Sequence, residues 1–211
     1  MWKDPPPPRV VRMVDLCLIA AVVFAIADWI AVTRQWRSLE YLAKPAALGF
    51  LLLYAALGPR ASWFLVAALT LSLLGDVYLM LPDELFPAGL FAFLLAHVAY
   101  IAAFDATLPA RGVWFVIVAG ASLPLALRII RSVPAAPLRV GVGLYMAAIS
   151  LMVASAIASG EMVATAGALL FFLSDSLIAV DRFVAPFAAA RVAIIVTYHV
   201  AQLLLVVALR Q

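Results

Sequence analysis

Two stretches of the chain each place an aspartate inside an apolar segment, with a histidine in the next apolar segment. The first holds Asp76 in LSLLGDVYLML and His97 in LLAHVAYIAAF; the second holds Asp175 in LLFFLSDSLIAV and His199 in TYHVAQLLLVV. The separation is 21 residues in one and 24 in the other, and both histidines begin an HVA tripeptide. A carboxyl group in the hydrocarbon of a membrane costs roughly 2.5–3.5 kcal/mol on insertion scales. Two of them at matching places therefore indicate a functional role.

Paired carboxyl groups favour acid catalysis. Two of them close together in a low-dielectric site cannot both ionise easily, so one stays an acid while the other is a carboxylate. A neighbouring Lys44 ammonium would keep one of them anionic. Such a pair can protonate a substrate and stabilise the cation that develops, as paired carboxylates do in glycosidases. This chemistry suits an ether or acetal better than an ester, and no G-x-S-x-G nucleophile motif is present.

A metal centre is disfavoured by the ligand inventory. The chain has two histidines, no H-x-x-x-H pair and one cysteine, Cys17, so a zinc site has few ligands to draw on. A site of two aspartates and two histidines remains possible by count. We expect no metal and no cofactor, and Cys17 alone cannot form a disulfide within the chain.

The elements that carry these residues are long apolar runs. Of 211 residues, 68% are hydrophobic and 12% are charged, and a spanning helix needs roughly 20 apolar residues. Runs of this length without strand alternation predict an all-α polytopic membrane bundle of eight helices. The expected spans are about Val14–Thr33, Tyr41–Gly58, Trp63–Leu81, Phe86–Phe104, Val113–Ile130, Val140–Ile157, Ala164–Val180 and Ala190–Ala208.

The first 13 residues are expected to be a Pro-rich solvated tail, ahead of a single transmembrane domain over residues 14–211. Lys3, Arg9 and Arg12 precede the first span but no small-residue cleavage site follows it, which predicts a retained helix. Basic residues are nearly balanced between the two sides, so only the tail favours a cytoplasmic N-terminus. The Ala-, Val- and Arg-rich composition suggests a bacterial inner membrane, and the net charge of +3 gives no indication of nucleic-acid binding.

The Asp…His pattern falls in spans three and four and again in spans seven and eight, which implies a four-plus-four parallel repeat. Alternate spans run in opposite directions, so a residue late in an odd span lies level with one early in an even span. This rule predicts a polar cavity open toward one face. The residues placed in one half of the membrane are Asp28, Asp76, Asp175, Lys44 and Tyr145, with His97, Tyr100, Tyr198 and His199 nearer the midplane.

Each of these residues also has a structural alternative. Asp28 could mark the interfacial end of its helix, and Lys44 could extend its ammonium group to the headgroups. Asp76 and Asp175 could pair with Lys44 as a buried structural ion pair. The two histidines could bridge helices by hydrogen bonds.

Several runs together resemble the YhhN-type lysoplasmalogenase family. They are A-K-P at Lys44, SLLGDVYLML, F-x-x-G-L-x-x-F-x-x-A-H-V-x-Y from Phe86 to Tyr100, Y-M-x-x-I-x-x-M from Tyr145 to Met152, and GALLFFLSDSLIAVDRF. The resemblance covers spans two to eight, and the combination of motifs is specific. The residues before Val14 and the first span carry no matching motif.

The resemblance implies hydrolysis of the vinyl-ether bond of a lysoplasmalogen, a lysophospholipid, to a fatty aldehyde and glycerophosphocholine or glycerophosphoethanolamine. Proton transfer to the β-carbon of the alkenyl group gives an oxocarbenium ion, water adds, and the hemiacetal collapses. The reaction needs an acid, an anion near the cation and a water molecule. The partners expected for the chain are thus the lysophospholipid and the surrounding membrane lipids.

Roles in such a reaction follow residue by residue. Asp76 and Asp175 are expected to be the acid and the counter-anion, without an assignment of which is which, and Lys44 would tune their charge. Arg182, in the D-R-F segment after span seven, would contact the substrate phosphate. The residues expected to position water or orient a carboxyl group are Tyr100, Tyr145 and His97, with His199 a weaker candidate.

Two other classes of protein fit part of the pattern. A four-plus-four bundle with polar groups at one depth could be a proton-coupled transporter of a small or amphipathic solute. The confinement of the polar groups to one half of the membrane argues against it, because a transport route needs access from both faces. A purely structural membrane protein would have no use for two costly intramembrane carboxyl groups.

Overall fold

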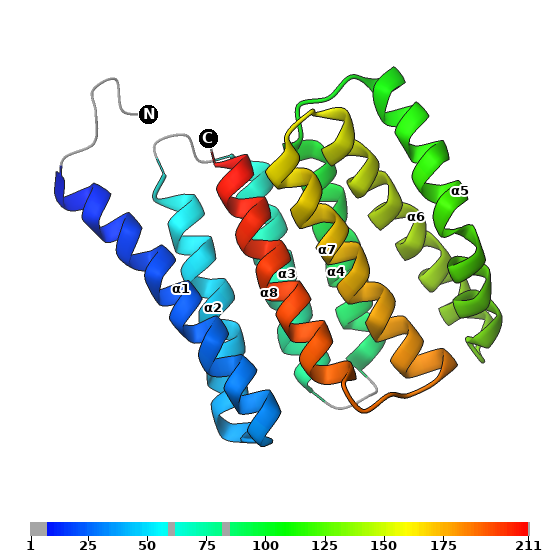
Figure 1. Ribbon diagram of the computed structural model, residues 1–211, viewed down its shortest axis with the longest axis horizontal. Coiled ribbons are helices and arrows are strands. Elements are labelled where there is room, and N and C mark those ends of the chain that lie inside the picture. Colours follow the sequence, from blue (N-terminus) through cyan, green and yellow to red (C-terminus); the bar gives the residue numbers. More distant parts are fainter. Residues whose placement is uncertain (1–7, 59–61, 82–84, 211) are drawn as a thin grey trace.

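The protein is a bundle of eight long helices (Figure 1). The computed structural model describes residues 8–58, 62–81 and 85–210. Each helix is long and apolar enough to cross a membrane, which confirms the expected fold class of a multi-pass integral membrane protein. The helices are α1 (Pro8–Arg34), α2 (Arg37–Ala56), α3 (Trp63–Met80), α4 (Phe86–Ala103), α5 (Leu108–Ser132), α6 (Ala136–Ala158), α7 (Met162–Ala179), continued by a π-helical turn η2 (Val180–Val184), and α8 (Ala190–Leu209).

The helices extend beyond several expected boundaries. Helix α1 begins at Pro8, six residues before the expected first span, so residues 8–13 are helical where a solvated tail was expected. Residues 1–7 of that tail, with Lys3, lie outside the described residues. Helices α5 and α6 also begin four to five residues early, each with a proline in its first turn, where the missing N–H is tolerated. The expected spans stop where charged arginines interrupt the apolar run, whereas the hydrogen-bonded helices continue through these arginines.

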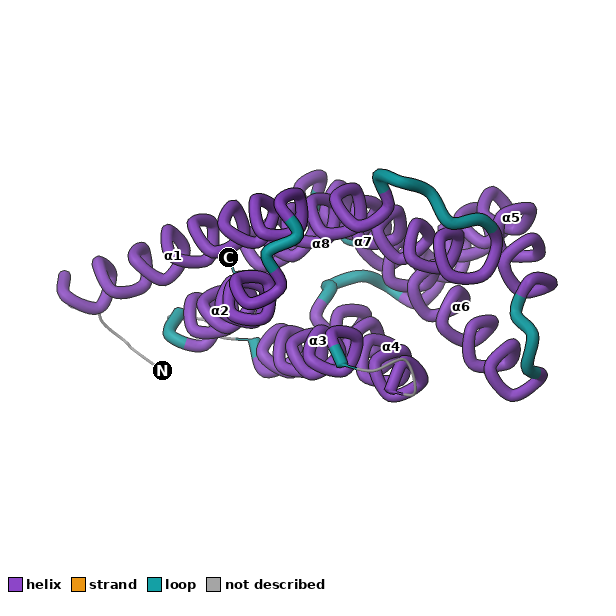
Figure 2. Tube along the Cα trace, turned by 90° about the horizontal axis from the view of Figure 1, so that it is seen from below, coloured by secondary structure: helices purple, strands orange, loops and turns teal. Residues whose placement is uncertain are grey.

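The bundle is built from four helical hairpins. Consecutive helices α1–α2, α3–α4, α5–α6 and α7–α8 pack most closely against each other. Seen from below, α2, α3 and α4 lie along one side of the molecule and α1, α8 and α7 along the other (Figure 2). The hairpins α1–α2 and α5–α6 lie at opposite ends, so α3, α4, α7 and α8 occupy the middle (Figure 1).

The two halves of the chain pack in equivalent ways. Helix α2 contacts α3 of its own half and α8 of the other, while α6 contacts α7 of its own half and α4 of the other. If each helix is replaced by its counterpart in the other half, the contacts α2–α3 and α2–α8 become α6–α7 and α6–α4. This is the packing that a four-plus-four arrangement predicts, although the internal repeat itself stays a prediction.

Two glycines allow the helices that carry the aspartates and histidines to approach closely. A Cβ at Gly75 would lie 2.6 Å from the Phe93 ring, and one at Gly167 would lie 3.0 Å from the backbone nitrogen of Leu205. Small residues at such contacts are a usual device of membrane helix packing. They set the spacing of α3 against α4 and of α7 against α8.

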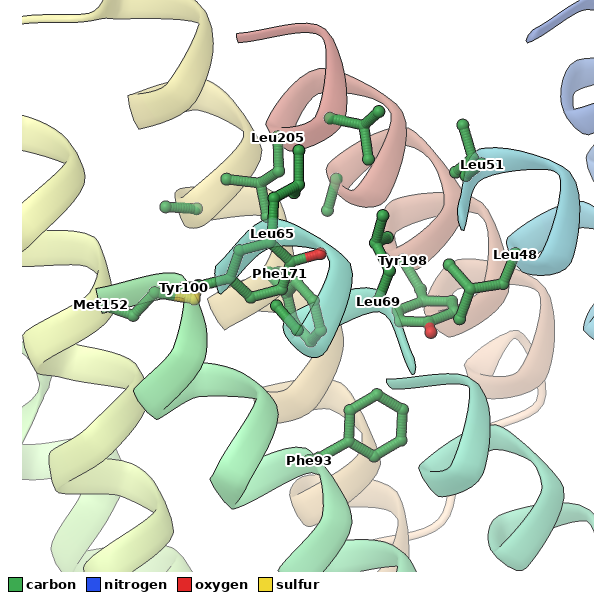
Figure 3. Packing of buried hydrophobic residues seen from close by; sticks show 14 of the residues in the cluster. Leu48, Leu51, Leu65, Leu69, Phe93, Tyr100, Met152, Phe171, Tyr198 and Leu205 are labelled. Atoms are coloured by element: carbon green, nitrogen blue, oxygen red, sulfur yellow. The ribbon is translucent and has the colours of Figure 1, made fainter. Parts of the chain in front are cut away.

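Aromatic side chains fill the middle of the bundle (Figure 3). Phe171 packs edge-on against Tyr198, Tyr100 and Phe93, with ring centroids 5.5 to 6.2 Å apart. These rings come from α4, α7 and α8, so one buried cluster joins both halves. The candidate site is arranged around this cluster.

Candidate active site

Asp76 is a fully paired carboxyl group in the centre of the bundle. Lys44 Nζ lies 3.0 Å from Asp76 Oδ1, and the Tyr198 hydroxyl donates a hydrogen bond of 2.7 Å to Oδ2. The Asp76 side chain is 2% exposed. The ammonium and the hydroxyl on its two oxygens favour the ionised form of Asp76, whereas burial disfavours it. Lys44 therefore pairs with a carboxylate inside the bundle, and its ammonium does not extend to the headgroups.

A chain of hydrogen bonds extends this cluster. Gln202 Nε2 donates to the Tyr198 hydroxyl at 3.3 Å, and the Tyr100 hydroxyl donates to Gln202 Oε1. Tyr100 and Gln202 are fully buried. Tyr100 thus supports Asp76 indirectly, through two intervening side chains on α8. Buried networks of this kind fix the geometry of the group at their end.

Asp175 lies in a separate polar cluster. The Tyr145 hydroxyl donates a short hydrogen bond to Asp175 Oδ2, and His97 Nε2 lies 3.6 Å from the same oxygen. His97 is fully buried, and within the part of the chain that the structure describes neither of its ring nitrogens has a hydrogen-bond partner. The 3.6 Å separation is too long for a hydrogen bond, so His97 is a neighbour of Asp175 that does not bind it directly.

The two carboxyl groups are held by different partners but share one aromatic wall. The Phe171 ring packs against Tyr198, which binds Asp76, and against His97, which lies beside Asp175; the centroid distances are 5.5 and 4.9 Å. Lys44 forms an ion pair with Asp76, and among the described residues no Lys or Arg forms one with Asp175. The sequence predicted that both carboxyl groups lie near Lys44. In the structure, Lys44 forms its ion pair with Asp76.

An apolar pocket opens directly onto Asp175. It encloses about 590 Å³, part of which is open to the surroundings, and lies among α4, α6 and α7. Asp175 and Tyr145 supply polar atoms to a wall that is otherwise almost entirely apolar, including Phe93, Met146 and Phe172. The Asp175 side chain is 10% exposed, compared with 2% for Asp76. Of the two carboxyl groups, Asp175 is therefore the one that a molecule in this pocket meets.

The rim of the pocket is formed around Phe86. The Arg182 guanidinium carbon lies 3.9 Å from the centroid of the Phe86 ring, and the Phe183 ring meets the same ring edge-on at 5.9 Å. Phe86 and Phe183 line the pocket, and Arg182 belongs to the π-helical turn η2. Turns of this type are frequent at functional sites because they redirect side chains at a helix end. Arg182 thus lies against a residue of the pocket wall.

Asp28 and His199 form a third cluster, between α1 and α8. His199 Nε2 lies 4.0 Å from Asp28 Oδ2, and Trp29 Nε1 donates to His199 Nδ1 at 3.1 Å. Asp28 is fully buried inside the bundle, whereas the structural alternative takes it as the mark of an interfacial helix end. His199 contacts neither catalytic candidate by a hydrogen bond or ion pair among the described residues.

The four side chains of the alternative metal site fall into three clusters. His97 lies beside Asp175, His199 lies beside Asp28, and Asp76 is bound by Lys44. In the part of the chain that the structure describes, no three His, Cys, Asp or Glu side chains come together as metal ligands. The arrangement supports acid–base chemistry by carboxyl groups.

Sequence reasoning did not single out Gln202 and Trp29. Gln202 links Tyr100 to Tyr198, and Trp29 orients His199. Gln202 follows His199 by three residues in an otherwise apolar run, so the cost of a polar group in hydrocarbon was a usable signal. Trp29 gave no such signal, because tryptophan is common near the ends of membrane helices.

The fold and the site define a multi-pass helical membrane protein with buried carboxyl groups beside an apolar pocket. A model of the YhhN family matches residues 39–209, and the chain belongs to that family. It is 31% identical over 205 residues to Lysoplasmalogenase TMEM86B of Mus musculus, which covers 94% of this chain and 87% of the relative. It is 33% identical over 168 residues to Lysoplasmalogenase TMEM86A of Homo sapiens, which covers 74% and 67% respectively. No solved structure is significantly similar to this chain.

Proposed function

We propose that this protein hydrolyses the vinyl-ether bond of a lysoplasmalogen, releasing a fatty aldehyde and a glycerophospho-headgroup. The observation that carries the proposal is the position of Asp175, a carboxyl group at the wall of an apolar pocket. Relatives that match most of this chain bear the name lysoplasmalogenase. The Ala-, Val- and Arg-rich composition makes a bacterial inner membrane the proposed location.

Asp175 is the proposed acid. Its partner among the described residues is the Tyr145 hydroxyl, and the surrounding wall is apolar. A carboxyl group in such surroundings without a cation keeps its proton, because burial disfavours the charged form. Tyr145 donates to Oδ2, so the acid proton can be presented from the other oxygen toward the pocket.

Asp76 is the proposed counter-anion. Lys44 and Tyr198 donate to its two oxygens, which stabilises the carboxylate and fixes its position. A fixed negative charge in a low-dielectric region stabilises a nearby oxocarbenium ion more strongly than it would in water. The hydrogen-bonded chain through Gln202 to Tyr100 keeps this charge in place during the reaction.

The proposed reaction balances without any further reagent except water. Asp175 transfers its proton to the β-carbon of the alkenyl ether, and the C=C electron pair forms the new C–H bond, leaving an oxocarbenium ion. Water adds to the carbon that bears the ether oxygen and returns a proton to the Asp175 carboxylate. Asp175 then gives this proton to the glycerol oxygen, the C–O bond of the hemiacetal breaks, and the hemiacetal hydroxyl proton returns to Asp175, giving the aldehyde and the alcohol.

The pocket accounts for the rest of the substrate. The alkenyl chain lies along the apolar wall formed by residues such as Met146, Ile149 and Phe172. Arg182 at the rim supplies a cationic group for the phosphate, and Arg commonly binds phosphate through paired N–H donors. The headgroup and the chain are thereby held on opposite sides of the Asp175 carboxyl group.

The direct test is aldehyde release from lysoplasmalogen by the purified protein in detergent. We expect Asp175→Asn and Asp76→Asn each to abolish release. The matched control is Asp105→Asn, because Asp105 is an exposed aspartate in the loop between α4 and α5. Hydrolysis in ¹⁸O-labelled water should leave the glycerol product unlabelled, because the bond that breaks is on the alkenyl side of the ether oxygen.

Three results would contradict the proposal. Near-normal turnover in Asp175→Asn would show that Asp175 is not the acid. Incorporation of ¹⁸O into the glycerol would show that water attacks the glycerol carbon and not the alkenyl carbon. Absence of aldehyde from folded wild-type protein, together with proton-coupled solute uptake by reconstituted vesicles, would establish the transporter alternative.

A further inference from the structure

Asp28 is a buried carboxyl group without a hydrogen-bond partner among the described residues. It is fully buried in α1, and no group in residues 8–58, 62–81 or 85–210 donates a hydrogen bond to either of its oxygens. His199 Nε2 on α8, 4.0 Å from Asp28 Oδ2, is also buried and has no hydrogen-bond partner in the same part of the chain. Buried polar atoms of this kind are uncommon, and leaving one unpaired costs about 1–3 kcal/mol.

Trp29 determines which His199 nitrogen carries the proton. The indole Nε1–H can only donate, and it donates to His199 Nδ1. Nδ1 is therefore unprotonated, so the proton of the neutral ring is on Nε2. A donor at His199 Nε2 thus faces an acceptor at Asp28 Oδ2 across a distance too long for a direct hydrogen bond.

The 4.0 Å separation suits a bridging oxygen. An oxygen placed roughly 2.8 Å from each atom satisfies both of them, as water does between polar groups that are too far apart to bond directly. This oxygen has to accept from His199 and donate to Asp28. A hydroxyl group does both, whereas an ammonium cannot accept from His199 and a carboxylate cannot donate to Asp28.

An apolar pocket lies beside His199 and Trp29, and Asp28 is behind its wall. It spans about 440 Å³ among α1, α2 and α8, part of which is open to the surroundings. Among the described residues, its polar lining atoms belong to the Trp29 and His199 side chains and to the backbone. Val22 and Ile26, on the lining, are 37% and 44% exposed, so the pocket opens toward the surrounding hydrocarbon. It shares no lining residue with the pocket at Asp175.

The depth of the pair matches the orientation of an amphiphile in a membrane. Asp28 lies six residues before the end of α1 at Arg34, which corresponds to roughly 9 Å along the helix. The lining residues Ala21 and Val22 lie deeper, toward the middle of the span. A polar head at Asp28 and a chain running inward toward Ala21 therefore follow the direction of the lipid tails.

We propose that this is a second binding site, for a single-chain amphiphilic alcohol. Its hydroxyl bridges His199 Nε2 and Asp28 Oδ2, and its hydrocarbon chain occupies the pocket among α1, α2 and α8. The assignment is independent of the hydrolase reaction, because neither the pair nor the pocket includes Asp175 or Asp76.

Quenching of Trp29 fluorescence tests the site directly. The full chain is prepared with its other four tryptophans (Trp2, Trp36, Trp63 and Trp114) replaced by phenylalanine, so that emission reports on the pocket wall alone. The probe is an undecanol with bromine at its far end, compared with its methyl ether and with bromoundecane. We expect the alcohol to quench at roughly tenfold lower mole fraction than the other two, the effect of one hydroxyl paired on both sides.

Protein variants supply the second arm of the test. Asp28→Leu and His199→Phe should make the alcohol quench no better than its methyl ether. Ala25→Leu, which enlarges an apolar side chain of the pocket lining and keeps Asp28 and His199, should weaken quenching by the alcohol. Equal quenching by all three probes in the starting protein would overturn the proposal and leave water as the only bridging group. This comparison among ligands needs no variant at Asp28 or His199 to fold.

Discussion

Lys44 and Asp76 form an ion pair in the interior of the bundle, with Nζ 3.0 Å from Oδ1 and side chains 15% and 2% exposed. The pair joins α2 to α3 at the level of the pocket that contains Asp175. Because the two charges compensate each other inside the protein, loss of either one affects both the stability of the fold and the net charge of the candidate site.

Removal of the Lys44 ammonium alone should lower the stability of the folded protein more than removal of both charges. We expect Lys44→Met to destabilise the protein by about 3–5 kcal/mol, because it leaves a buried carboxylate without its cation. The double variant Lys44→Met/Asp76→Asn should recover much of this stability while remaining inactive. Thermal unfolding in detergent of the wild type, Lys44→Met, Asp76→Asn and the double variant measures the coupling. Additive losses would show that the two side chains do not interact energetically.

Loss of the Tyr145 hydroxyl should slow turnover with little effect on folding. Phenylalanine at 145 keeps the ring that packs on His97 at 5.0 Å but cannot donate to Asp175. A hydrogen bond to a carboxyl group of this kind contributes about 1.5–3 kcal/mol, so kcat should fall at least roughly tenfold. Tyr41→Phe, which removes an exposed hydroxyl bonded to the Met80 carbonyl, is the control and should leave kcat unchanged.

A methyl group at Gly75 should force α3 away from α4. Its Cβ would lie 2.6 Å from the Phe93 ring, and overpacking of this kind costs about 1–3 kcal/mol. Gly120→Ala is the matched control, since no atom lies within 4 Å of the added Cβ on α5. Thermal unfolding should show a loss for Gly75→Ala and no loss for Gly120→Ala. Equal stability of the two variants would contradict the close approach.

A larger side chain in the Asp175 pocket should shorten the preferred alkenyl chain. Ile149→Phe narrows the wall of the pocket on α6 on the inner side of Tyr145, so kcat/KM should fall most for the longest chains. Each methylene excluded from the pocket costs about 0.8 kcal/mol of binding. Val116→Phe is the control, because Val116 is 70% exposed on α5 and lines neither pocket. A uniform loss at all chain lengths would place the chain elsewhere.

Arg182→Gln should separate headgroup binding from chemistry. Activity on a lysoplasmalogen should fall through a raised KM, whereas activity on an alkenyl glycerol without phosphate should be nearly unchanged. Arg131→Gln, an exposed arginine in the last turn of α5, serves as the control. Equal effects on both substrates would show that Arg182 holds the pocket rim through Phe86 and makes no contact with phosphate.

The sequence predicted the level of the polar groups better than their partners. Level follows from rise per residue and helix direction, so Lys44 on α2 and Asp76 on α3 were expected in the same half, and they form an ion pair. Partner choice depends on the rotation of each helix and on which helices are neighbours. For this reason Tyr145 at Asp175, and the link from Tyr100 through Gln202 to Tyr198, became evident only from the packed structure.

The end of α7 could not be predicted for a different reason. Hydropathy placed a span end near Val180, where the structure has the π-helical turn Val180–Val184. That turn depends on one additional residue in the hydrogen-bonded ring, which leaves no mark in apolar periodicity. Its effect is local but important, because it places Arg182 and Phe183 against Phe86.

The late positions of Asp76 and Asp175 in α3 and α7, level with the early positions of Lys44 and Tyr145 in α2 and α6, also give the protein a sidedness. A lipid chain that reaches Asp175 enters from the leaflet at that level, and a lipid in the opposite leaflet has to cross the membrane first. Vesicles in which all copies face the same way should therefore be depleted of substrate in one leaflet rapidly and in the other only as fast as lipids exchange between them. The rate of supply would then be set by the membrane itself, through lipid flip-flop, and the polarity of insertion would decide which pool of lipids is consumed.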